Sequence, residues 1–330
     1  MKKILNNPND VVSDMVSGMI QAFPEKLEQI EGTMVIKRKE LSSNKVGLVS
    51  GGGSGHEPAH AGYVGKGMLD AAVVGEVFTS PTPDQILEAI KAVDTGNGVL
   101  LIVKNYTGDV MNFDMASELA ESEGIEVEQV IVNDDVAVED SDFTTGRRGI
   151  AGTVFVHKIA GAMAETGATL KEVKEVAEKT IKQVRSMGMA LTPCTVPAAG
   201  KPSFQLEDNE MEIGIGIHGE AGIERKPITS AENIANELTQ KVLDDLRLQS
   251  GEEVAVMING LGSTPEMELF ILQQHVNRLL KDNNLSVFRT YVGEFMTSLE
   301  MAGCSVTLLK VDDQLKSLLE ATSEATSFRV

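Results

Sequence analysis

The sequence VGLVSGGGSGHEPAH occupies residues 46–60 and joins a short apolar run to a cluster of glycines. The run Val46–Ser50 is typical of a buried parallel strand that ends in glycines. Two later runs, AAVVG at 71–75 and GVLLIV at 98–103, repeat the pattern. Between them, apolar residues at helical spacing in Pro83–Val93 predict a crossover helix. This alternation of strand and helix indicates an α/β sheet.

The rest of the chain supplies further elements of both kinds. From about Gly152 to Met187 the pattern is helical, with a break at Gly167 between two helices. A loop dense in Pro, Gly and Ser follows near Ser186. We therefore predict two α/β domains, 1–185 and 186–330, each a sheet with helices packed on it. The other predicted helices are 109–121, 231–246, 266–280 and one at the C-terminus, and the other predicted strands are 127–132, 211–217, 253–259, 286–292 and 305–309.

Composition and charge exclude several classes of protein. The chain has 330 residues and a formal net charge of −20, from 49 acidic and 29 basic residues. Such acidity does not suit binding along nucleic acid or to an anionic membrane. No apolar run follows the N-terminal lysines, and no stretch is long enough to span a bilayer. Cys194 and Cys304 match no metal-binding spacing, so we expect a cytoplasmic protein with reduced thiols.

Residues 56–60, His-Glu-Pro-Ala-His, match the zinc-protease pattern H-E-x-x-H. That pattern places both histidines on one face of a helix, with the glutamate as base. Proline is tolerated at the first position of a helix but not in its interior. If a helix begins at Pro58, His56 lies before it and the two imidazoles do not share a face. We therefore interpret the match as a coincidence and expect no metal.

The glycines before His56 allow a second interpretation. Gly51–Gly55 are expected to form a tight turn between the strand and a helix that opens at Pro58. Such a loop, at the carboxyl end of a parallel strand, is where open α/β sheets bind small molecules. His56 would then project into a pocket. A glycine-rich turn with a solvated histidine is the alternative.

Nucleotide-binding motifs give no support for a phosphate site on this chain. No window satisfies the Walker A pattern. The segment Gly214–Gly219, GIGIHG, fits G-x-G-x-x-G, but its glycines alternate with isoleucines inside a predicted strand. They do not follow a strand and open a helix, as the dinucleotide fingerprint requires.

Two further segments carry residues suited to chemistry. Lys104-Asn105-Tyr106-Thr107-Gly108-Asp109 follows the run at 98–103 directly. Asp109 suits either a helix N-cap or a general base beside the glycine loop. His218 lies between the Gly-Ile run and Gly219-Glu220, and either a site residue or a structural histidine fits there. His60, His157 and His275 are interpreted as structural or ordinary.

Taken together, the motifs resemble the family of dihydroxyacetone kinase K subunits. The resemblance rests on three motifs in order, GGGSGHEP, KNYTGD and GIGIHGE. It runs nearly end to end and includes VGEVFTSP at 74–81, TTGRRGIAGT at 144–153 and NGLGSTP at 259–265. It implies an enzyme, a phosphotransferase that acts on dihydroxyacetone.

The resemblance also implies roles for individual residues. A ring nitrogen of His218 would add to the ketone carbonyl as a covalent hemiaminal. Asp109 would be the base for a substrate hydroxyl, and His56 a hydrogen-bonding acid or base. The substrate pocket would further include Gly53, Lys104 and Ser80.

The phosphoryl donor is expected on another protein. Members that use ATP directly carry an extra nucleotide-binding domain, and the chain ends at Val330 without one. The resemblance therefore implies the phosphoenolpyruvate-dependent form. In that form an L subunit holds ADP or ATP with Mg²⁺, and a phosphotransferase-system M protein recharges the nucleotide. It also implies a homodimer. Two alternatives stay open, a dihydroxyacetone sensor that acts as coactivator of a transcription regulator and an enzyme for another ketone or aldehyde.

Overall fold

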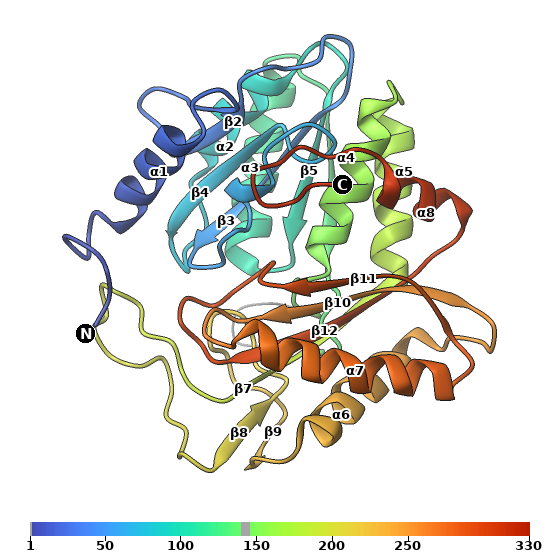
Figure 1. The fold of residues 1–330 in the computed structure, drawn as a ribbon. Coiled ribbons are helices and arrows are strands. Elements are labelled where there is room, and N and C mark those ends of the chain that lie inside the picture. The colour runs from blue at the N-terminus through green and yellow to red at the C-terminus, as the bar shows by residue number, and fades with distance from the viewer. Residues whose placement is uncertain (1, 140–145) are drawn as a thin grey trace.

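The computed structural model describes residues 2–139 and 146–330 and contains two six-stranded mixed sheets with helices packed on them (Figure 1). The first sheet has the order β1-β2-β4-β3-β5-β6. Its strands β4, β3, β5 and β6 are parallel, and β1 and β2 extend it antiparallel. The strands are β1 Leu27–Gln29, β2 Val35–Arg38, β3 Gly47–Ser54, β4 Ala71–Val77, β5 Val99–Lys104 and β6 Val127–Val132.

Helices cover both faces of the first sheet. Helices α2 and α3 pack on one face, where Val49 and Leu101 meet Ile86 and Phe113. Helices α4 and α5 pack on the other, together with α1 near β1 and β4. Because β5 is buried on both faces, its sequence VLLIVK is almost continuously apolar rather than alternating, and the equally buried β3 combines apolar residues with glycine and serine. The helices are α1 Val11–Ala22, α2 Pro83–Val93, α3 Thr107–Ser122, α4 Thr153–Glu165 and α5 Leu170–Gln183.

The second sheet has the order β11-β10-β12-β7-β8-β9, in which only β10 and β11 are parallel. Alternate residues of β10 face opposite sides. Val254 and Val256 belong to the cluster under α6 and α7, and Ala255 and Met257 face the cluster around α4. The elements are β7 Val184–Ala190, β8 Glu210–Ile213, β9 Glu224–Pro227, α6 Ala231–Leu246, β10 Glu253–Gly260, α7 Glu266–Asp282, β11 Ser286–Gly293, β12 Gly303–Lys310 and α8 Asp313–Glu320.

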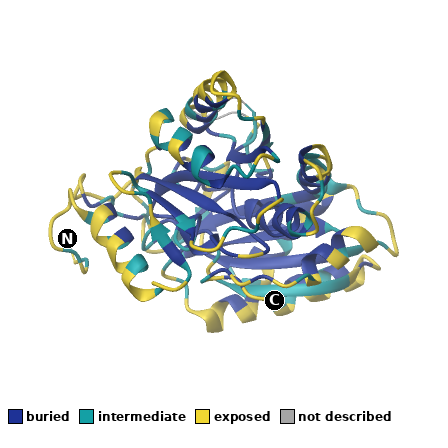
Figure 2. Ribbon diagram, turned by 90° about the horizontal axis from the view of Figure 1, so that it is seen from above, coloured by how far each residue is buried: buried dark blue, intermediate teal, exposed yellow. Residues whose placement is uncertain are grey.

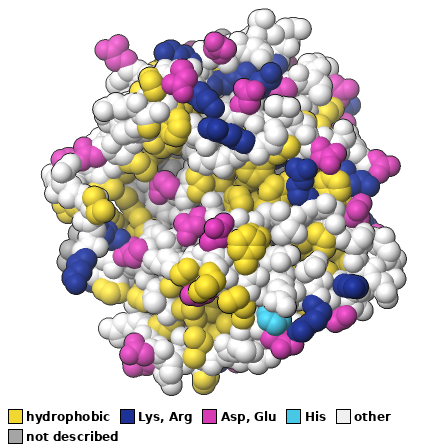
Figure 3. All heavy atoms as spheres, in the orientation of Figure 1, with side chains coloured by type: hydrophobic (Ala, Val, Ile, Leu, Met, Phe, Trp, Pro, Cys, Tyr) yellow, Lys and Arg dark blue, Asp and Glu magenta, His cyan; other side chains and the backbone are white. Residues whose placement is uncertain are grey.

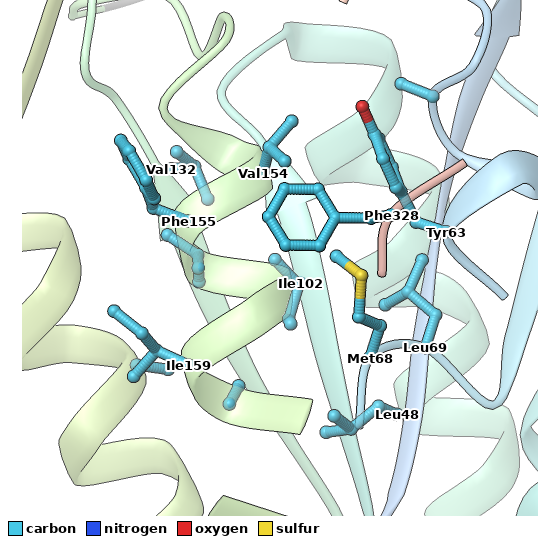
Figure 4. Packing of buried hydrophobic residues seen from close by; sticks show 14 of the residues in the cluster. Leu48, Tyr63, Met68, Leu69, Ile102, Val132, Val154, Phe155, Ile159 and Phe328 are labelled. Carbon is cyan, nitrogen blue, oxygen red and sulfur yellow. The ribbon is translucent and has the colours of Figure 1, made fainter. Parts of the chain in front are cut away.

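One hydrophobic core joins the two halves of the chain. It combines side chains of both sheets with α4, α8 and the C-terminal segment that follows α8. Phe328 of that segment stacks on Tyr291, with ring centroids 5.5 Å apart, and meets the edge of Tyr63. Figure 4 shows Phe328 beside Tyr63 and near Met68 in this core. The C-terminus therefore packs on the first half of the molecule, as Figure 1 also shows.

The predicted α/β class and most of the predicted elements are confirmed, but the prediction for residues 184–190 is wrong. We expected a helix up to Met187 and then a loop. Instead α5 ends at Gln183 and the chain enters β7 at once, between β12 and β8. The Arg185 side chain donates hydrogen bonds to the carbonyls of Ile181 and Lys182, which satisfies acceptors at the end of α5. The division into domains at Ser186 stays a prediction.

The expectation for residues 51–60 is also wrong. The glycines form no turn, because β3 continues through Gly51–Gly53 to Ser54 and pairs with β4. No α-helix opens at Pro58, where turns precede a short 3₁₀ helix, Ala61–Tyr63. The strand continues because its glycines pair with β4 so closely that no side chain would fit. A Cβ on Gly53 would lie 2.5 Å from the Thr79 nitrogen.

The surface agrees with the acidic, mixed composition. Figure 2 shows buried residues in the sheets and exposed ones on the outer sides of the helices and in loops. Figure 3 shows Asp and Glu scattered among Lys and Arg on its face, with hydrophobic side chains exposed in front of α7. None of the helices within residues 2–139 and 146–330 has the length and hydropathy needed to cross a membrane.

We predict that Phe328→Ala lowers the free energy of unfolding by about 3 kcal/mol, since it leaves a cavity in the shared core. Urea unfolding followed by circular dichroism measures the change. Phe270→Ala is the control, because that ring is 52% exposed and its loss should cost less than about 0.5 kcal/mol. Equal small losses for both variants would show that the C-terminal segment does not support the core.

Candidate active site

The candidate site lies where the carboxyl ends of β3, β4 and β5 meet, at the edge of the first sheet that faces the second half (Figure 1). Parallel neighbours end at one edge, so the loops that follow them converge there. The loop after β8 approaches from the second half and carries His218. Together they enclose a pocket of about 490 Å³ lined by Gly53, Phe78, Thr79, Ser80, Tyr106, Gly108, Asp109, Asn112 and His218.

The His218 ring is held by a carboxylate. Its Nδ1 lies 2.8 Å from Glu220 Oε1, and its backbone N–H donates to Glu220 Oε2 at 2.9 Å. Burial opposes ionisation, but His218 and Arg148 lower the pKa of Glu220 to about 2. An ionised carboxylate only accepts hydrogen bonds, so Nδ1 carries the proton and Nε2 keeps its lone pair. The arrangement makes Nε2 a nucleophile.

Aromatic rings hold the same imidazole on several sides. Tyr106 and Phe78 meet it edge-on, with centroids 4.6 and 5.2 Å from that of His218. The His56 ring meets it at 4.8 Å and stacks on Phe78 at 5.0 Å. These contacts limit rotation of the His218 ring and leave its side chain only 17% exposed.

His56 is fully buried next to the pocket, and one of its nitrogens has a fixed partner. Nδ1 donates to the Thr297 carbonyl at 2.8 Å, and Nε2 has no hydrogen-bond partner among the residues that the structure describes. Burial, and then the charges of Lys104 and His218, hold the pKa of His56 well below its usual range. A neutral ring with Nδ1 protonated leaves Nε2 as a hydrogen-bond acceptor.

Lys104 and Asp109 border the same small space beside Gly52. A Cβ there would lie 3.2 Å from Lys104 Nζ and 3.6 Å from Asp109 Oδ2. The lysine is buried, and its amine has no hydrogen-bond partner within the described part of the chain. Burial lowers the pKa of Lys104, although the carboxylates of Asp109, Glu220 and Asp134 oppose the shift. A buried lysine amine and a carboxylate therefore border the same space next to the pocket.

The alternative role of Asp109 as a helix cap is wrong. Tyr106 occupies the N-cap of α3, and Asp109 lies within the first turn. Its Oδ1 accepts a hydrogen bond from the Ser80 hydroxyl, so the carboxylate faces the loop after β4. Ser80 and Asp109 thus meet at the pocket, which both of them line.

The five residues of the H-E-x-x-H match do not form a metal site. Residues 57–60 form turns, so His56 and His60 are not one turn apart on a helix. The Nδ1 atom of His60 lies 2.9 Å from Nε2 of His157, away from His56 and its Thr297 partner. Within the described residues no group of three or more His, Cys, Asp or Glu side chains could hold a metal.

The GIGIHG segment lies outside the strand in which we placed it. Strand β8 ends at Ile213, and residues 214–219 form a loop. That loop opens no helix, so it does not have the structure of a dinucleotide fingerprint. The loop places His218 in the lining of the pocket.

Sequence reasoning missed Glu220, Tyr106 and Phe78 as parts of the site, although all three stand inside the motifs that it quoted. Their importance depends on contacts with His218 that no spacing along the chain shows. Of the residues that it did predict, Gly53, Ser80, Asp109 and His218 line the pocket, and His56 and Lys104 lie buried against it.

Comparisons with known proteins identify the family. The Dak1 domain family matches residues 17–327. The dihydroxyacetone-binding subunit DhaK of a phosphotransferase-system (PTS)-dependent dihydroxyacetone kinase from Listeria innocua is 57% identical over 95% of both chains. The DhaK subunit of the phosphoenolpyruvate (PEP)-dependent kinase from Escherichia coli is 45% identical over 97% of both. The chain therefore belongs to the Dak1 family, and within it to the DhaK subunits.

Solved structures agree with this fold. The dihydroxyacetone kinase of C. freundii superposes with a TM-score of 0.91 at 37% identity, over 99% of this chain and 60% of that one. The dihydroxyacetone kinase operon co-activator DhaQ superposes with a TM-score of 0.90 at 38% identity, over 95% of this chain and 97% of that one.

We predict that His56 stays neutral at pH 5.5, because its lowered pKa shifts proton uptake to lower pH. Nitrogen-15 NMR of the histidine rings should show the Nδ1–H tautomer, with His56→Gln used for assignment. A histidine in an unfolded peptide is mostly cationic at this pH and serves as the reference. A cationic His56 signal at pH 5.5 would contradict the assignment of Nε2 as an acceptor.

Proposed function

We propose that this chain is the dihydroxyacetone-binding subunit of a PEP- and PTS-dependent dihydroxyacetone kinase. It would bind the ketone covalently on His218 and present a terminal hydroxyl for phosphorylation to dihydroxyacetone phosphate. The observation that carries the proposal is the distance of 2.8 Å between His218 Nδ1 and the Glu220 carboxylate, which makes Nδ1 the donor and, in the neutral ring, Nε2 the nitrogen with the free lone pair. The 57% identity to a named DhaK subunit supports the same substrate.

The proposed covalent step uses the lone pair that Nε2 has in the neutral His218 imidazole. Nε2 of His218 adds its lone pair to the carbonyl carbon, and the C=O π electrons move to oxygen. The positive charge that develops on the imidazole is stabilised by the Glu220 carboxylate. The carbonyl oxygen takes up a proton and the ring gives up its Nδ1 proton, so the hemiaminal is neutral. Dihydroxyacetone offers few atoms for contact, and a covalent bond holds it where non-covalent affinity is limited.

The phosphoryl acceptor step needs a base. Asp109 would remove the proton of the terminal hydroxyl as the phosphoryl group arrives, since a hydroxyl is otherwise a poor nucleophile. Nε2 of His56 would accept a hydrogen bond from a substrate hydroxyl. Ser80 orients the Asp109 carboxylate, and Lys104 and Gly53 complete the pocket.

The donor side of the reaction belongs to partners in this proposal. An L subunit would bring ADP or ATP with Mg²⁺, and a phosphotransferase-system M protein would recharge the nucleotide from phosphoenolpyruvate. Relatives that match this chain over nearly their whole length are named as subunits of PTS-dependent or PEP-dependent kinases, which supports a multi-subunit enzyme. The proposal includes a homodimer and a cytoplasmic location, where phosphoenolpyruvate is available.

A co-activator role is the second candidate function, because the fold of this chain is so similar to that of the co-activator DhaQ. A sensor needs to bind dihydroxyacetone but not to phosphorylate it. The Ser80–Asp109 pair beside Lys104 favours the kinase, since it supplies a carboxylate at the pocket in addition to the ketone-binding histidine. Turnover with an L subunit and its recharging proteins distinguishes the two functions.

We predict that His218→Ala abolishes the covalent adduct. Intact-mass spectrometry after incubation with dihydroxyacetone should show one added ketone on the wild type and none on the variant. His275→Ala is the control, because that ring lies on α7 outside the pocket and its loss should leave the adduct intact. An adduct on folded His218→Ala protein would contradict the proposed role of His218 as the residue that binds the ketone covalently.

We predict that Asp109→Asn keeps the adduct but lowers kcat roughly 10²-fold or more, since it removes the general base. Phosphate transfer is measured with a loaded L subunit in excess. The control, Asp114→Asn, changes an exposed carboxylate further along the same helix, one that accepts from Gln129, and should leave kcat unchanged. Near-normal turnover of Asp109→Asn would remove Asp109 from the mechanism.

A further inference from the structure

We propose that Arg148 is a positioning residue for His218: its buried guanidinium anchors the loop at 214–220 and holds the Glu220 carboxylate against the imidazole. The effect of Arg148 on the His218 ring is independent of the proposed function. Only its expected effect on ketone binding rests on that function. Arg148 belongs to the segment 144–153, whose first two residues lie outside the described part of the chain. No role in the site was expected for it.

The guanidinium has a fixed position. Arg148 is 0% exposed. Its Nε donates to Asp135 Oδ2 at 2.8 Å, and its Nη2 lies 2.6 Å from the same oxygen. Although burial opposes it, the Asp135 carboxylate raises the pKa of Arg148, so the side chain stays charged. A buried, paired arginine of this kind is a rigid attachment point.

From this point Arg148 contacts one end of the His218 loop and lies near the other without a direct hydrogen bond to it. Nη2 also donates to the Gly214 carbonyl at 2.8 Å, where the chain leaves β8. Nη1 has no hydrogen-bond partner among the described residues, and it lies on the side of the Glu220 carboxylate. A Cβ on Gly216 would be 2.7 Å from Nη1 and 1.9 Å from Glu220 Oε2. The two charged groups therefore border the same space over Gly216.

This arrangement explains how a carboxylate stays ionised in a buried place. Burial alone penalises the charged form of Glu220, whose side chain is 4% exposed. His218 compensates that penalty most, through its charge and its hydrogen bond, and the cationic Arg148 adds to this compensation from the other side. Without Arg148, Glu220 would take up a proton or turn away, and His218 Nδ1 would lose its acceptor. The tautomer of His218 thus depends on a residue that does not touch it.

Gly216 supplies an independent way to disturb the same arrangement, because both charged groups border the space over it. Any side chain there overlaps side-chain atoms of Glu220 and Arg148 and no backbone atom among the nearest, so these side chains, and not the main chain, have to shift. Gly216→Ala should therefore fold while separating the carboxylate from the guanidinium. Arg148→Met removes the cation itself and leaves Asp135 without its partner, which costs stability.

The experiment compares Arg148→Met and Gly216→Ala with the control Arg147→Met. Arg147 pairs with Asp245 at the surface and makes no contact with the His218 loop that the structure records. Nitrogen-15 NMR of the ligand-free protein, with His218→Ala used for assignment, reports which ring nitrogen carries the proton. We expect Nδ1–H alone in the wild type and in Arg147→Met, and a mixture of tautomers in the two test variants.

Ketone binding gives the second measurement. The dihydroxyacetone concentration that half-saturates adduct formation should rise on the order of tenfold in both test variants, as for other residues that orient a ligand through a second group. In a Glu220→Gln background, Arg148→Met should add little to this change, because its effect passes through Glu220. A purely structural role would instead lower stability in both backgrounds equally.

The outcomes separate the two proposals. Pure Nδ1–H in the wild type and mixed tautomers in both test variants, with no ketone adduct on the wild type, would overturn the proposed function while supporting the role of Arg148. Folded Gly216→Ala and Arg148→Met proteins with the wild-type tautomer and half-saturation would overturn the role of Arg148. If Arg148→Met does not fold, Gly216→Ala decides by the same two measurements.

Discussion

The close approach of β3 to the turn after β4 is the constraint on which the site depends. The backbone at Gly53 lies so near Phe78 and Thr79 that a Cβ would sit 2.5 Å from the Thr79 nitrogen. This contact places the Phe78 ring against His56 and directs Ser80 toward Asp109. The glycines therefore serve the site by permitting contact between two strand ends. A ligand-binding turn, which their number suggested, would need them for a different reason.

The two histidines of the site have neighbours of different charge, and this difference suits them to different roles. Both keep Nδ1 protonated, but His56 donates to a neutral carbonyl and His218 to a carboxylate. His56, buried near the cationic Lys104, resists a further positive charge. His218 lies beside an anion that compensates the charge formed when Nε2 attacks a carbonyl. We infer that the ring suited to covalent addition is His218, and that His56 is suited to accept a hydrogen bond.

How much the sequence could predict depends on whether a feature is local. The bounds of strand Val127–Val132 and helix Pro83–Val93 were predicted to the residue. In each, the faces that are buried make apolar residues recur along the sequence with the period of that element. Strand β7 was not predicted, because its character comes from pairing with β12 and β8, which lie far along the chain. Glu220 and Arg148 were missed for the same reason, since each acts through a contact between separated segments.

The two tasks of the proposed kinase subunit rest on different halves of the chain. The proposed ketone-binding group, His218, stands on a loop of the second half, where its ring meets the Glu220 carboxylate. The group that would activate the hydroxyl, Asp109, stands on the first turn of α3 in the first half. A sensor could retain the first without the second, because binding needs only the nucleophile and its support. Relatives with one fold can thus differ in function by changes confined to the first turn of α3 and to its partner Ser80.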